Sequence, residues 1–281
     1  MKRINSVAIQ QTIAQLCIKA NTQLRADVLS ALKKACQNET KPRAKDILIA
    51  IIKNAALARK ENLAICQDTG LPVVFVELGD NVKLTGDLKK AINNGVEAGY
   101  KKVYLRNSIV DKPLLRGTAG FKPVVIHLDL VQGNNLKLTV LPKGFGCENK
   151  SRLKMFLPTA GISQIKQFIT ESVREAGPDA CPPFIVGVGI GGTADYACFL
   201  AKKALLKKVT RSQGHKVTSH VSKLEQDLLR EINKLNIGPM GLGGKTTCLG
   251  IRIQAHPTHI AGLPVAVNIS CHALRSATKI L

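Results

Sequence analysis

The spacing of hydrophobic positions predicts a helical segment over the first sixty residues. Apolar side chains recur every three or four positions, as on the buried face of an amphipathic helix. Three stretches show this pattern, the third of them just after Pro42: SVAIQQTIAQLCIKA, ADVLSALKKAC and AKDILIAIIKNAALA. We therefore expect three helices in succession at the start of the chain.

From Leu71 onward, predicted strands and helices follow one another. Runs rich in β-branched residues and bounded by Gly, Pro or Asn predict strands; they are LPVVFVEL, KPVVIHLDLV, NLKLTVLPKG, PPFIVGVGIGG, CLGIRIQAH and LPVAVNIS. Helical spacing occurs in LTGDLKKAINNGVEAGYKKV, TAGISQIKQFITESVREAG, TADYACFLAKKALL and SHVSKLEQDLLREINKL. Thr85 or Asp87 is the expected cap of the first of these helices.

This order predicts the α/β class (mixed α+β), with a helical N-terminal segment followed by mixed sheet layers packed with helices. Neither an internal repeat nor a long polar linker interrupts the 281 residues. Residues 1–281 are therefore predicted to form a single domain.

Composition adds little to the fold but narrows the class of protein. The chain is 45% hydrophobic and 21% charged, which is typical of a soluble globular protein. Its apolar runs are shorter than the roughly 20 residues that span a bilayer. The basic N-terminus MKRINSVAIQQTIAQLC has Gln, Gln and Thr where a signal peptide has its apolar core. We expect a cytoplasmic protein without a membrane partner.

The net charge of +22 favours anionic partners. Lys and Arg are nevertheless spread along the chain in ones and twos, as in ALKKAC and AKKALLKK, and aromatic residues make up only 4%. Nucleic-acid binders more often combine a basic patch with aromatic residues that stack on bases. A solvated lysine surface and no nucleic-acid partner are the prediction, with a nucleic-acid binder as an alternative that charge alone supports.

Two glycine-rich stretches resemble nucleotide-binding motifs. GVGIGG fits G-x-G-x-x-G at Gly187, Gly189 and Gly192, which makes a dinucleotide-dependent oxidoreductase an alternative function. No acidic residue follows at the usual ribose position, although Arg211 suits a phosphorylated ribose. GPMGLGGKTT has Pro239 where a P-loop requires Gly, so what remains is a glycine-rich loop suited to an anion.

Three cysteines stand beside residues that are unsuited to plain packing. Cys66 precedes Gln67 and Asp68, Cys181 precedes two prolines, and Cys271 precedes a histidine. The eight cysteines include no CxxC pair, which argues against zinc ribbons and thioredoxin-like motifs. Three such thiols suit an iron–sulfur cluster that leaves one iron without a protein ligand.

An open iron is a Lewis acid for a hydroxyl or carboxylate oxygen. The planar guanidinium of Arg106 suits a carboxylate, and Lys150 adds a cation within the glycine-rich loop KGFGCENKS. Together these residues predict lyase chemistry on a carboxylic acid.

Six motifs in order then resemble one known family: CQDTG, LRNS, PKGFGCENKS, CPPFIVGVGIGGTAD, GPMGLGGKTT and HIAGLPVAVN followed by CH. They resemble the alpha subunit of class I (iron–sulfur) fumarate hydratase, to which the L(+)-tartrate dehydratase alpha subunit is related. The resemblance implies that Cys66, Cys181 and Cys271 hold a 4Fe–4S cluster. It also implies catalytic roles for Asp68 and His259, and substrate contacts from Gln67, Arg106, Gly146, Asn149 and Lys150.

The reaction that the resemblance implies is reversible hydration of fumarate, a small dicarboxylate, to malate. The ENKS loop favours fumarate, and L-tartrate dehydration is the alternative. In this family a second, C-terminal domain contributes residues, and here the chain ends ten residues after Cys271. We therefore expect a separately encoded beta subunit and a heterotetramer, with no activity from this chain alone.

Two stretches depart from the family pattern. Cys147 stands where the family usually has a serine, either as an isostere or as an oxidisable thiol. RGTAGFKP differs from the family's NTGDNTP-like stretch, so no contact is assigned to it.

Overall fold

The computed structural model describes residues 2–209 and 220–281. The chain divides into two compact units, each described by itself. Unit 1 comprises Met1–Arg25, Asn54–Phe145 and Arg275–Leu281, and unit 2 comprises Ala26–Lys53 and Gly146–Leu274. The single domain over 1–281 stays a prediction, whereas the mixed α/β class is confirmed.

The helices in chain order are α1 Ser6–Thr22, α2 Ala26–Asn38, α3 Pro42–Glu61, α4 Leu88–Lys102, α5 Phe145–Glu148, α6 Ile162–Ala176, α7 Ala194–Ala204 and α8 His220–Asn233, with short 3₁₀ turns η1 Pro178–Ala180 and η2 Pro239–Gly241. The strands are β1 Lys2–Asn5, β2 Leu71–Gly79, β3 Val82–Thr85, β4 Ile109–Val110, β5 Ala119–Gly120, β6 Val125–Val131, β7 Leu136–Lys143, β8 Arg152–Phe156, β9 Phe184–Gly192, β10 Cys248–Thr258, β11 Leu263–Ser270 and β12 Ala277–Ile280. The expected helices and strands are thus confirmed, and Ser219 at the start of the last expected helix lies outside the described residues.

Unit 1 is built on a four-stranded sheet of order β12-β7-β2-β6. β2 pairs with β6 in parallel and with β7 antiparallel. The consecutive strands β6 and β7 are therefore not hairpin partners, because β2 lies between them. This order places the residues just before β2 beside the end of β7.

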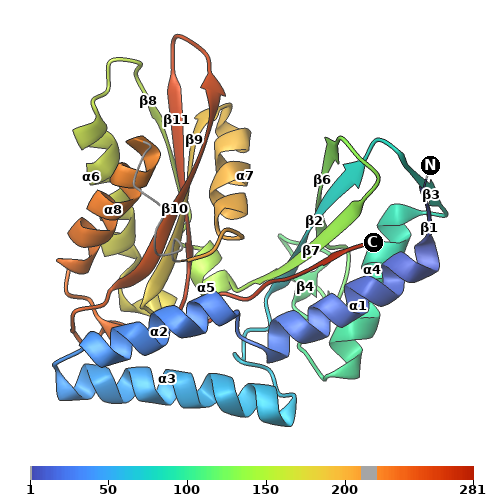
Figure 1. The fold of residues 1–281 in the computed structure, drawn as a ribbon, viewed down its shortest axis with the longest axis horizontal. Coiled ribbons are helices and arrows are strands. Elements are labelled where there is room, and N and C mark those ends of the chain that lie inside the picture. Colours follow the sequence, from blue (N-terminus) through green and yellow to red (C-terminus); the bar gives the residue numbers. More distant parts are fainter. Residues whose placement is uncertain (1, 210–219) are drawn as a thin grey trace. The chain divides into compact units, whose positions relative to one another are not determined.

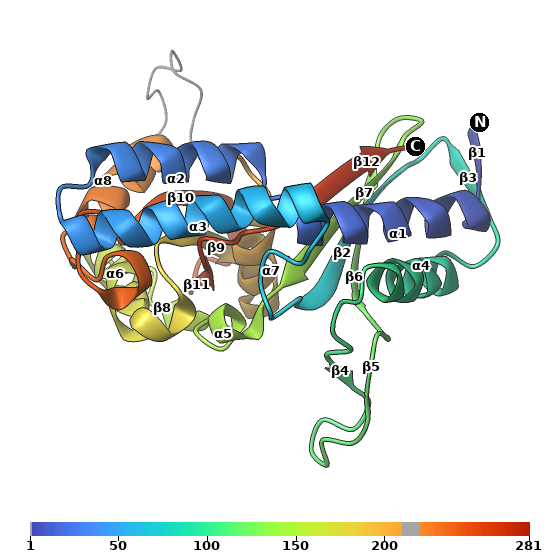
Figure 2. The same cartoon turned by 90° about the horizontal axis from the view of Figure 1, so that it is seen from below.

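Helices α1 and α4 lie side by side in unit 1 (Figures 1 and 2). Their apolar faces share one core with β2 and β7. A Cβ on Gly95 or Gly99 of α4 would stand 2.6 Å from a main-chain oxygen of α1, so glycine permits the close approach. Asp87 is the cap of α4, since its side chain accepts a hydrogen bond from the Lys90 N–H at 2.9 Å.

Unit 2 has a four-stranded sheet of order β10-β9-β11-β8, covered on both faces (Figure 1). Alternate residues of β9 point to opposite faces, as the pleat of a strand requires. Phe184, Val186 and Val188 join the core that includes residues of α6 and α8, whereas Gly187 and Gly189 meet α7. Four of the five residues of the edge strand β8 are exposed.

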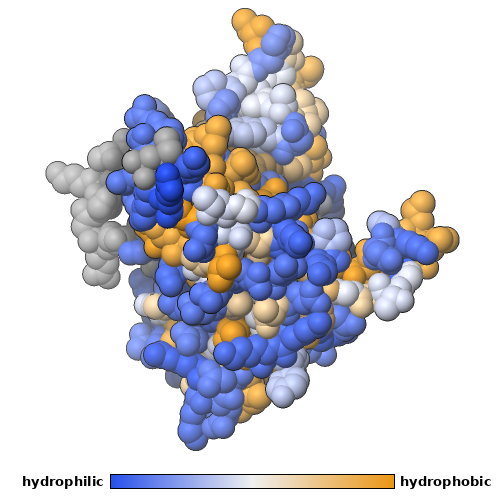
Figure 3. Space-filling model, turned by 90° about the vertical axis from the view of Figure 1, so that its right-hand side faces the viewer, coloured by the Kyte–Doolittle hydropathy of each residue, from blue (hydrophilic) through white to orange (hydrophobic). Residues whose placement is uncertain are grey.

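On the face of the molecule shown in Figure 3, hydrophilic residues predominate and hydrophobic residues are interspersed among them. None of the helices in the described ranges has the length and apolar character that crossing a membrane requires.

Candidate functional site

The segment between α3 and β2 carries the first group of predicted site residues. Cys66 and Asp68 are half-buried and Gln67 is exposed. Gly70 adopts φ +75°, and a Cβ there would lie 2.8 Å from the carbonyl carbon of Pro142. The segment therefore packs directly against the main chain of β7, and this close approach, together with the positive φ, requires glycine at position 70.

The carboxylate of Asp68 is held by two main-chain N–H groups. Oδ1 accepts from Gly70 at 2.9 Å and Oδ2 accepts from Phe145 at 2.8 Å. Bonds from N–H groups to a charged acceptor fix its orientation more strongly than neutral pairs do. The predicted catalytic carboxylate thus has a defined direction in unit 1.

The main chain of the same segment is also fixed by side chains. Arg275 Nη2 donates to the Asp68 carbonyl at 2.7 Å, and the Tyr100 hydroxyl donates to the Thr69 carbonyl at 2.9 Å. Burial raises the pKa of the Tyr100 hydroxyl, so it remains a protonated donor. Sequence reasoning missed both residues.

Arg106 lies close to this segment through its main chain. Its N–H donates to the Thr69 hydroxyl at 3.1 Å, and the residue itself is exposed just beyond α4. An exposed arginine side chain suits recognition of an anionic ligand.

In unit 2, one end of the sheet carries Cys181 and Cys271. Cys181 precedes β9 and Cys271 follows β11, which runs antiparallel to β9, so both cysteines stand at the same end. The main-chain N–H and the ring Nδ1 of His272 both reach the Cys181 carbonyl, at 3.4 and 3.1 Å. The structure thus brings these two predicted ligand residues onto neighbouring turns.

Residues 147–151, here called the CENKS loop, lie at the same end of the sheet. The Cys147 thiol donates to the Ala180 carbonyl at 3.2 Å, next to Cys181. Asn268 of β11 donates to Glu148 and to Ser151, at 3.0 and 2.9 Å.

The predicted substrate contacts of this loop differ in their surroundings. Lys150 forms an ion pair of 3.6 Å with Asp179, and Asn149 is exposed. At Gly146 a Cβ would meet its nearest atom only at 3.9 Å, so the structure gives no steric reason for glycine there.

His259 is not brought to this end of the sheet. It lies in the turn before β11, whereas Cys271 follows that strand. β11 has eight residues, which at about 3.3 Å each make a strand roughly 26 Å long. Within one chain His259 and Cys271 are therefore far apart. The length of the strand predicted from the sequence already indicated this separation.

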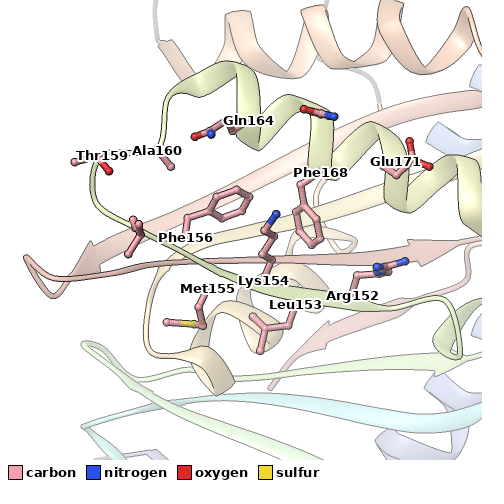
Figure 4. Close-up of a pocket in the computed structure, with 12 residues that line it drawn as sticks. Arg152, Leu153, Lys154, Met155, Phe156, Thr159, Ala160, Gln164, Phe168 and Glu171 are labelled. Carbon is pink, nitrogen blue, oxygen red and sulfur yellow. The ribbon is translucent and has the colours of Figure 1, made fainter.

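A groove of about 660 Å³ lies between β8 and α6 in unit 2 (Figure 4). Phe156 and Phe168 meet edge to face with ring centroids 5.8 Å apart, and the Lys154 Nζ lies 4.9 Å from the centre of the Phe156 ring. The predicted site residues do not line it. We place the candidate site on the loops, because the chemically competent groups are there.

Comparison with known proteins decides the family. A family model described as fumarate hydratase (Fumerase) matches residues 10–279. The chain belongs to the fumarate hydratase family. This places it among the hydro-lyases, enzymes that add water to or remove it from a carbon–carbon double bond.

Curated relatives align with this member of the fumarate hydratase family over nearly its whole length. A Methanocaldococcus jannaschii protein, provisionally assigned as L(+)-tartrate dehydratase subunit alpha, is 39% identical and covers 96% of both chains. The L(+)-tartrate dehydratase subunit alpha of Escherichia coli (strain UTI89 / UPEC) is 30% identical over 96% of this chain and 89% of its own. That of strain K12 is 29% identical over 97% and 90%.

The glycines of GVGIGG have a packing role in this fumarate hydratase family member. A Cβ on Gly187 would lie 2.1 Å from the Ala201 carbonyl oxygen, and one on Gly189 would lie 2.0 Å from that of Ala197. Both glycines are inside β9 and let α7 rest on the sheet. They need no dinucleotide to explain them. Arg211, considered for a phosphorylated ribose, lies outside the described residues.

The loop GPMGLGGKTT already faces an anion of the chain itself. The buried Glu39 accepts from the N–H of Lys245 at 2.7 Å, and from Thr40 and Lys41 at 2.9 and 3.0 Å. Burial would raise the pKa of Glu39, but these hydrogen bonds outweigh it and hold the pKa below its usual value. The expected anion site is thus filled by Glu39.

In the described parts of the two units, no three His, Cys, Asp or Glu side chains gather to hold a metal ion. Of the predicted ligands, Cys66 belongs to unit 1, and Cys181 and Cys271 belong to unit 2. All three are half-buried residues on loops and carry thiols rather than disulfides. As a donor set, three thiols of this kind fit an iron–sulfur cluster.

Proposed function

We propose that this chain is the alpha subunit of an iron–sulfur hydro-lyase that interconverts fumarate and malate. Membership of the fumarate hydratase family supports the reaction class. The observation that carries the proposal is the shared end of the unit 2 sheet, where Cys181, Cys271 and the CENKS loop meet. It supports a metal ligand pair next to a substrate loop.

The proposed cofactor is a 4Fe–4S cluster with Cys66, Cys181 and Cys271 as its ligands. Thiolates are the usual protein ligands of such clusters. When bound, a cluster with three protein ligands supplies an open iron that acts as a Lewis acid toward the hydroxyl that leaves as water.

The chain's own residues would bind and orient the dicarboxylate. Arg106 is proposed to pair with one carboxylate, where it stabilises the negative charge that builds up as the neighbouring C–H loses its proton. Gln67 is proposed to donate a hydrogen bond from its exposed amide. Asn149 and Lys150 are proposed to line the substrate from the CENKS loop, and Gly146 from the position just before it.

Asp68 is proposed to act as a hydrogen-bond or proton acceptor in the reaction. Its carboxylate is already oriented by Gly70 and Phe145, so binding substrate requires no search for a productive rotamer. Hydration then adds a proton to one carbon and a hydroxyl to the other, and dehydration reverses both.

A role for His259 requires a second copy of the chain, because the length of β11 separates it from Cys271. We propose that His259 serves the site of another alpha subunit in a heterotetramer with a separately encoded beta subunit. The names of the relatives as alpha subunits support a companion chain. Co-expressing Cys271→Ser and His259→Ala chains should restore about a quarter of the wild-type sites, and no restoration would remove His259 from the site.

L(+)-tartrate is the second candidate substrate, and the names of the curated relatives favour it. The ENKS loop, in contrast, supports fumarate. Both substrates are four-carbon acids with two carboxylates, so the proposed contacts of Arg106 serve either.

A turnover assay tests the proposal. The chain, co-expressed with a candidate beta subunit and purified anaerobically, should form malate from fumarate at an enzyme-like rate, faster than it dehydrates L(+)-tartrate. Turnover of L(+)-tartrate alone would change the substrate and keep the reaction class. Turnover of neither, in a preparation that holds iron, would refute the proposal.

A further inference from the structure

Arg275 is a buried arginine with an incomplete set of hydrogen bonds. It is 3% exposed and begins the C-terminal segment of unit 1. Nη2 donates to the Asp68 carbonyl oxygen at 2.7 Å. Its Nε and Nη1 are also buried, and neither has a hydrogen-bond partner among the described residues.

Such an arrangement is costly unless something compensates it. A buried guanidinium ordinarily pairs with a carboxylate, and leaving it unpaired costs several kcal/mol. Here the one hydrogen-bond acceptor among the residues that the structure describes is a neutral carbonyl group. Among the described residues the protein therefore keeps at this segment, which carries Cys66 and Asp68, a positive charge that has no hydrogen bond to a carboxylate.

The contact acts on the main chain of a residue whose side chain is fixed separately. The Asp68 carboxylate is held by the N–H groups of Gly70 and Phe145, and its carbonyl is held by Arg275. A Cβ on Gly144 would lie 3.2 Å from Asp68 Oδ2 and 4.0 Å from Arg275 Nη2, so both groups approach the same point of the main chain.

We propose that Arg275 is a positioning residue for the reaction, acting through the main chain of Asp68. Its charge also balances the negative charge that gathers at this segment from the Asp68 carboxylate and a dicarboxylate substrate. The kinetic part of this inference rests on the proposed function. The structural part, fixation of the Asp68 segment, does not.

Amide hydrogen exchange tests the structural part in the full chain. The N–H groups of Gly70 and Phe145 report the orientation of the Asp68 carboxylate. Arg275→Met should lower the protection of these two amides at least about tenfold, with the amides of β2 unchanged. Arg25→Met is the matched control, because Arg25 contacts Ser276 and lies outside the predicted site.

Steady-state kinetics of the anaerobically loaded complex test the reaction. Arg275→Met should lower kcat about 100-fold, as misplaced groups do, and raise KM about tenfold through the lost charge. Arg275→Lys keeps the charge without the planar fork. It should therefore restore KM while kcat stays low. A merely structural role would not separate the two constants in this way.

The outcomes divide clearly. Unchanged protection at Gly70 and Phe145 in Arg275→Met, or an equal loss over all of unit 1, would overturn the inference. If Arg275→Met does not fold, Arg275→Lys must show reduced protection at both amides, and wild-type protection would overturn it. Absence of turnover in the wild type would contradict the proposed function, while the exchange experiment would still judge the positioning of Asp68.

Discussion

Replacing Asp68 by Asn removes a charge and one acceptor from the segment before β2. In the wild type, both carboxylate oxygens accept main-chain N–H groups, at 2.9 Å from Gly70 and 2.8 Å from Phe145. An asparagine has a single carbonyl oxygen and an NH₂ group. One of the two N–H groups must therefore face a donor.

The size of the effect follows from that lost bond. A hydrogen bond to a charged group contributes about 1.5–3 kcal/mol when it is well buried. Phe145 is exposed, so water replaces part of its bond. We expect Asp68→Asn to lower the free energy of unfolding by about 1–2 kcal/mol. It should also abolish most of the proposed activity.

Urea unfolding of the full chain measures this change from the midpoint and slope of the transition. Asp87→Asn is a matched control, because Asp87 caps α4 through a bond to Lys90 N–H at 2.9 Å and asparagine caps helices equally well. The control should stay within a few tenths of a kcal/mol. If Asp68→Asn lowers the free energy of unfolding no more than Asp87→Asn does, the reasoning from the two hydrogen bonds is refuted. Full activity of Asp68→Asn would remove Asp68 from the mechanism.

Three further outcomes follow from single contacts. Gly144→Ala puts a methyl group 3.2 Å from Asp68 Oδ2, so kcat should fall about tenfold with little change in the free energy of unfolding. Gly120→Ala is the control, because the nearest atoms to its new methyl group are 3.9 Å away, and it should keep wild-type kinetics. Equal kinetics for both variants would contradict the packing argument. The folded-state pKa of Glu39 lies below its usual 4.5, so its contribution is complete above that pH and is lost as the pH falls through the folded pKa. Urea unfolding should therefore show Glu39→Gln less stable by about 1.5–3 kcal/mol at pH 7, with the gap closing below pH 4.5; a gap independent of pH would count against the charge. Burial raises the pKa of Cys248 to about 12, so mass spectrometry after iodoacetamide treatment at pH 8 should find it unmodified until the chain unfolds, and modification of the folded chain would contradict this.

Among the described residues, local sequence patterns predicted every α-helix except the short α5, and they predicted the strands β2, β6, β7, β9, β10 and β11. This was possible because the periodicity of these elements is set by neighbours in the chain. The pairing of strands was less accessible. β6 and β7 follow each other in the chain, yet β2 lies between them in the sheet. Both pairings of β2 join residues that are far apart in the sequence, so no local pattern indicates them. β8 was not predicted, and it is a short edge strand in which four of the five residues are exposed.

The residues of the candidate site likewise divide into those that local sequence indicates and those that only the fold reveals. Motifs identified Cys66, Asp68 and Arg106, because these residue types are unusual beside apolar runs. Arg275 carried no local signal, and its contact with Asp68 spans 207 residues of sequence. Glu39 similarly meets Lys245 across 206 residues. Long-range electrostatic partners of this kind require a fold before they can be named.

Iron and sulfide analysis of the anaerobically purified, co-expressed protein tests the central claim most directly. The wild type and Cys36→Ser, a half-buried cysteine of α2 outside the proposed ligand set, should hold about four irons per chain. Cys66→Ser, Cys181→Ser and Cys271→Ser should each lose the cluster. A wild type without iron, or any of these three variants with its full complement, would contradict the account.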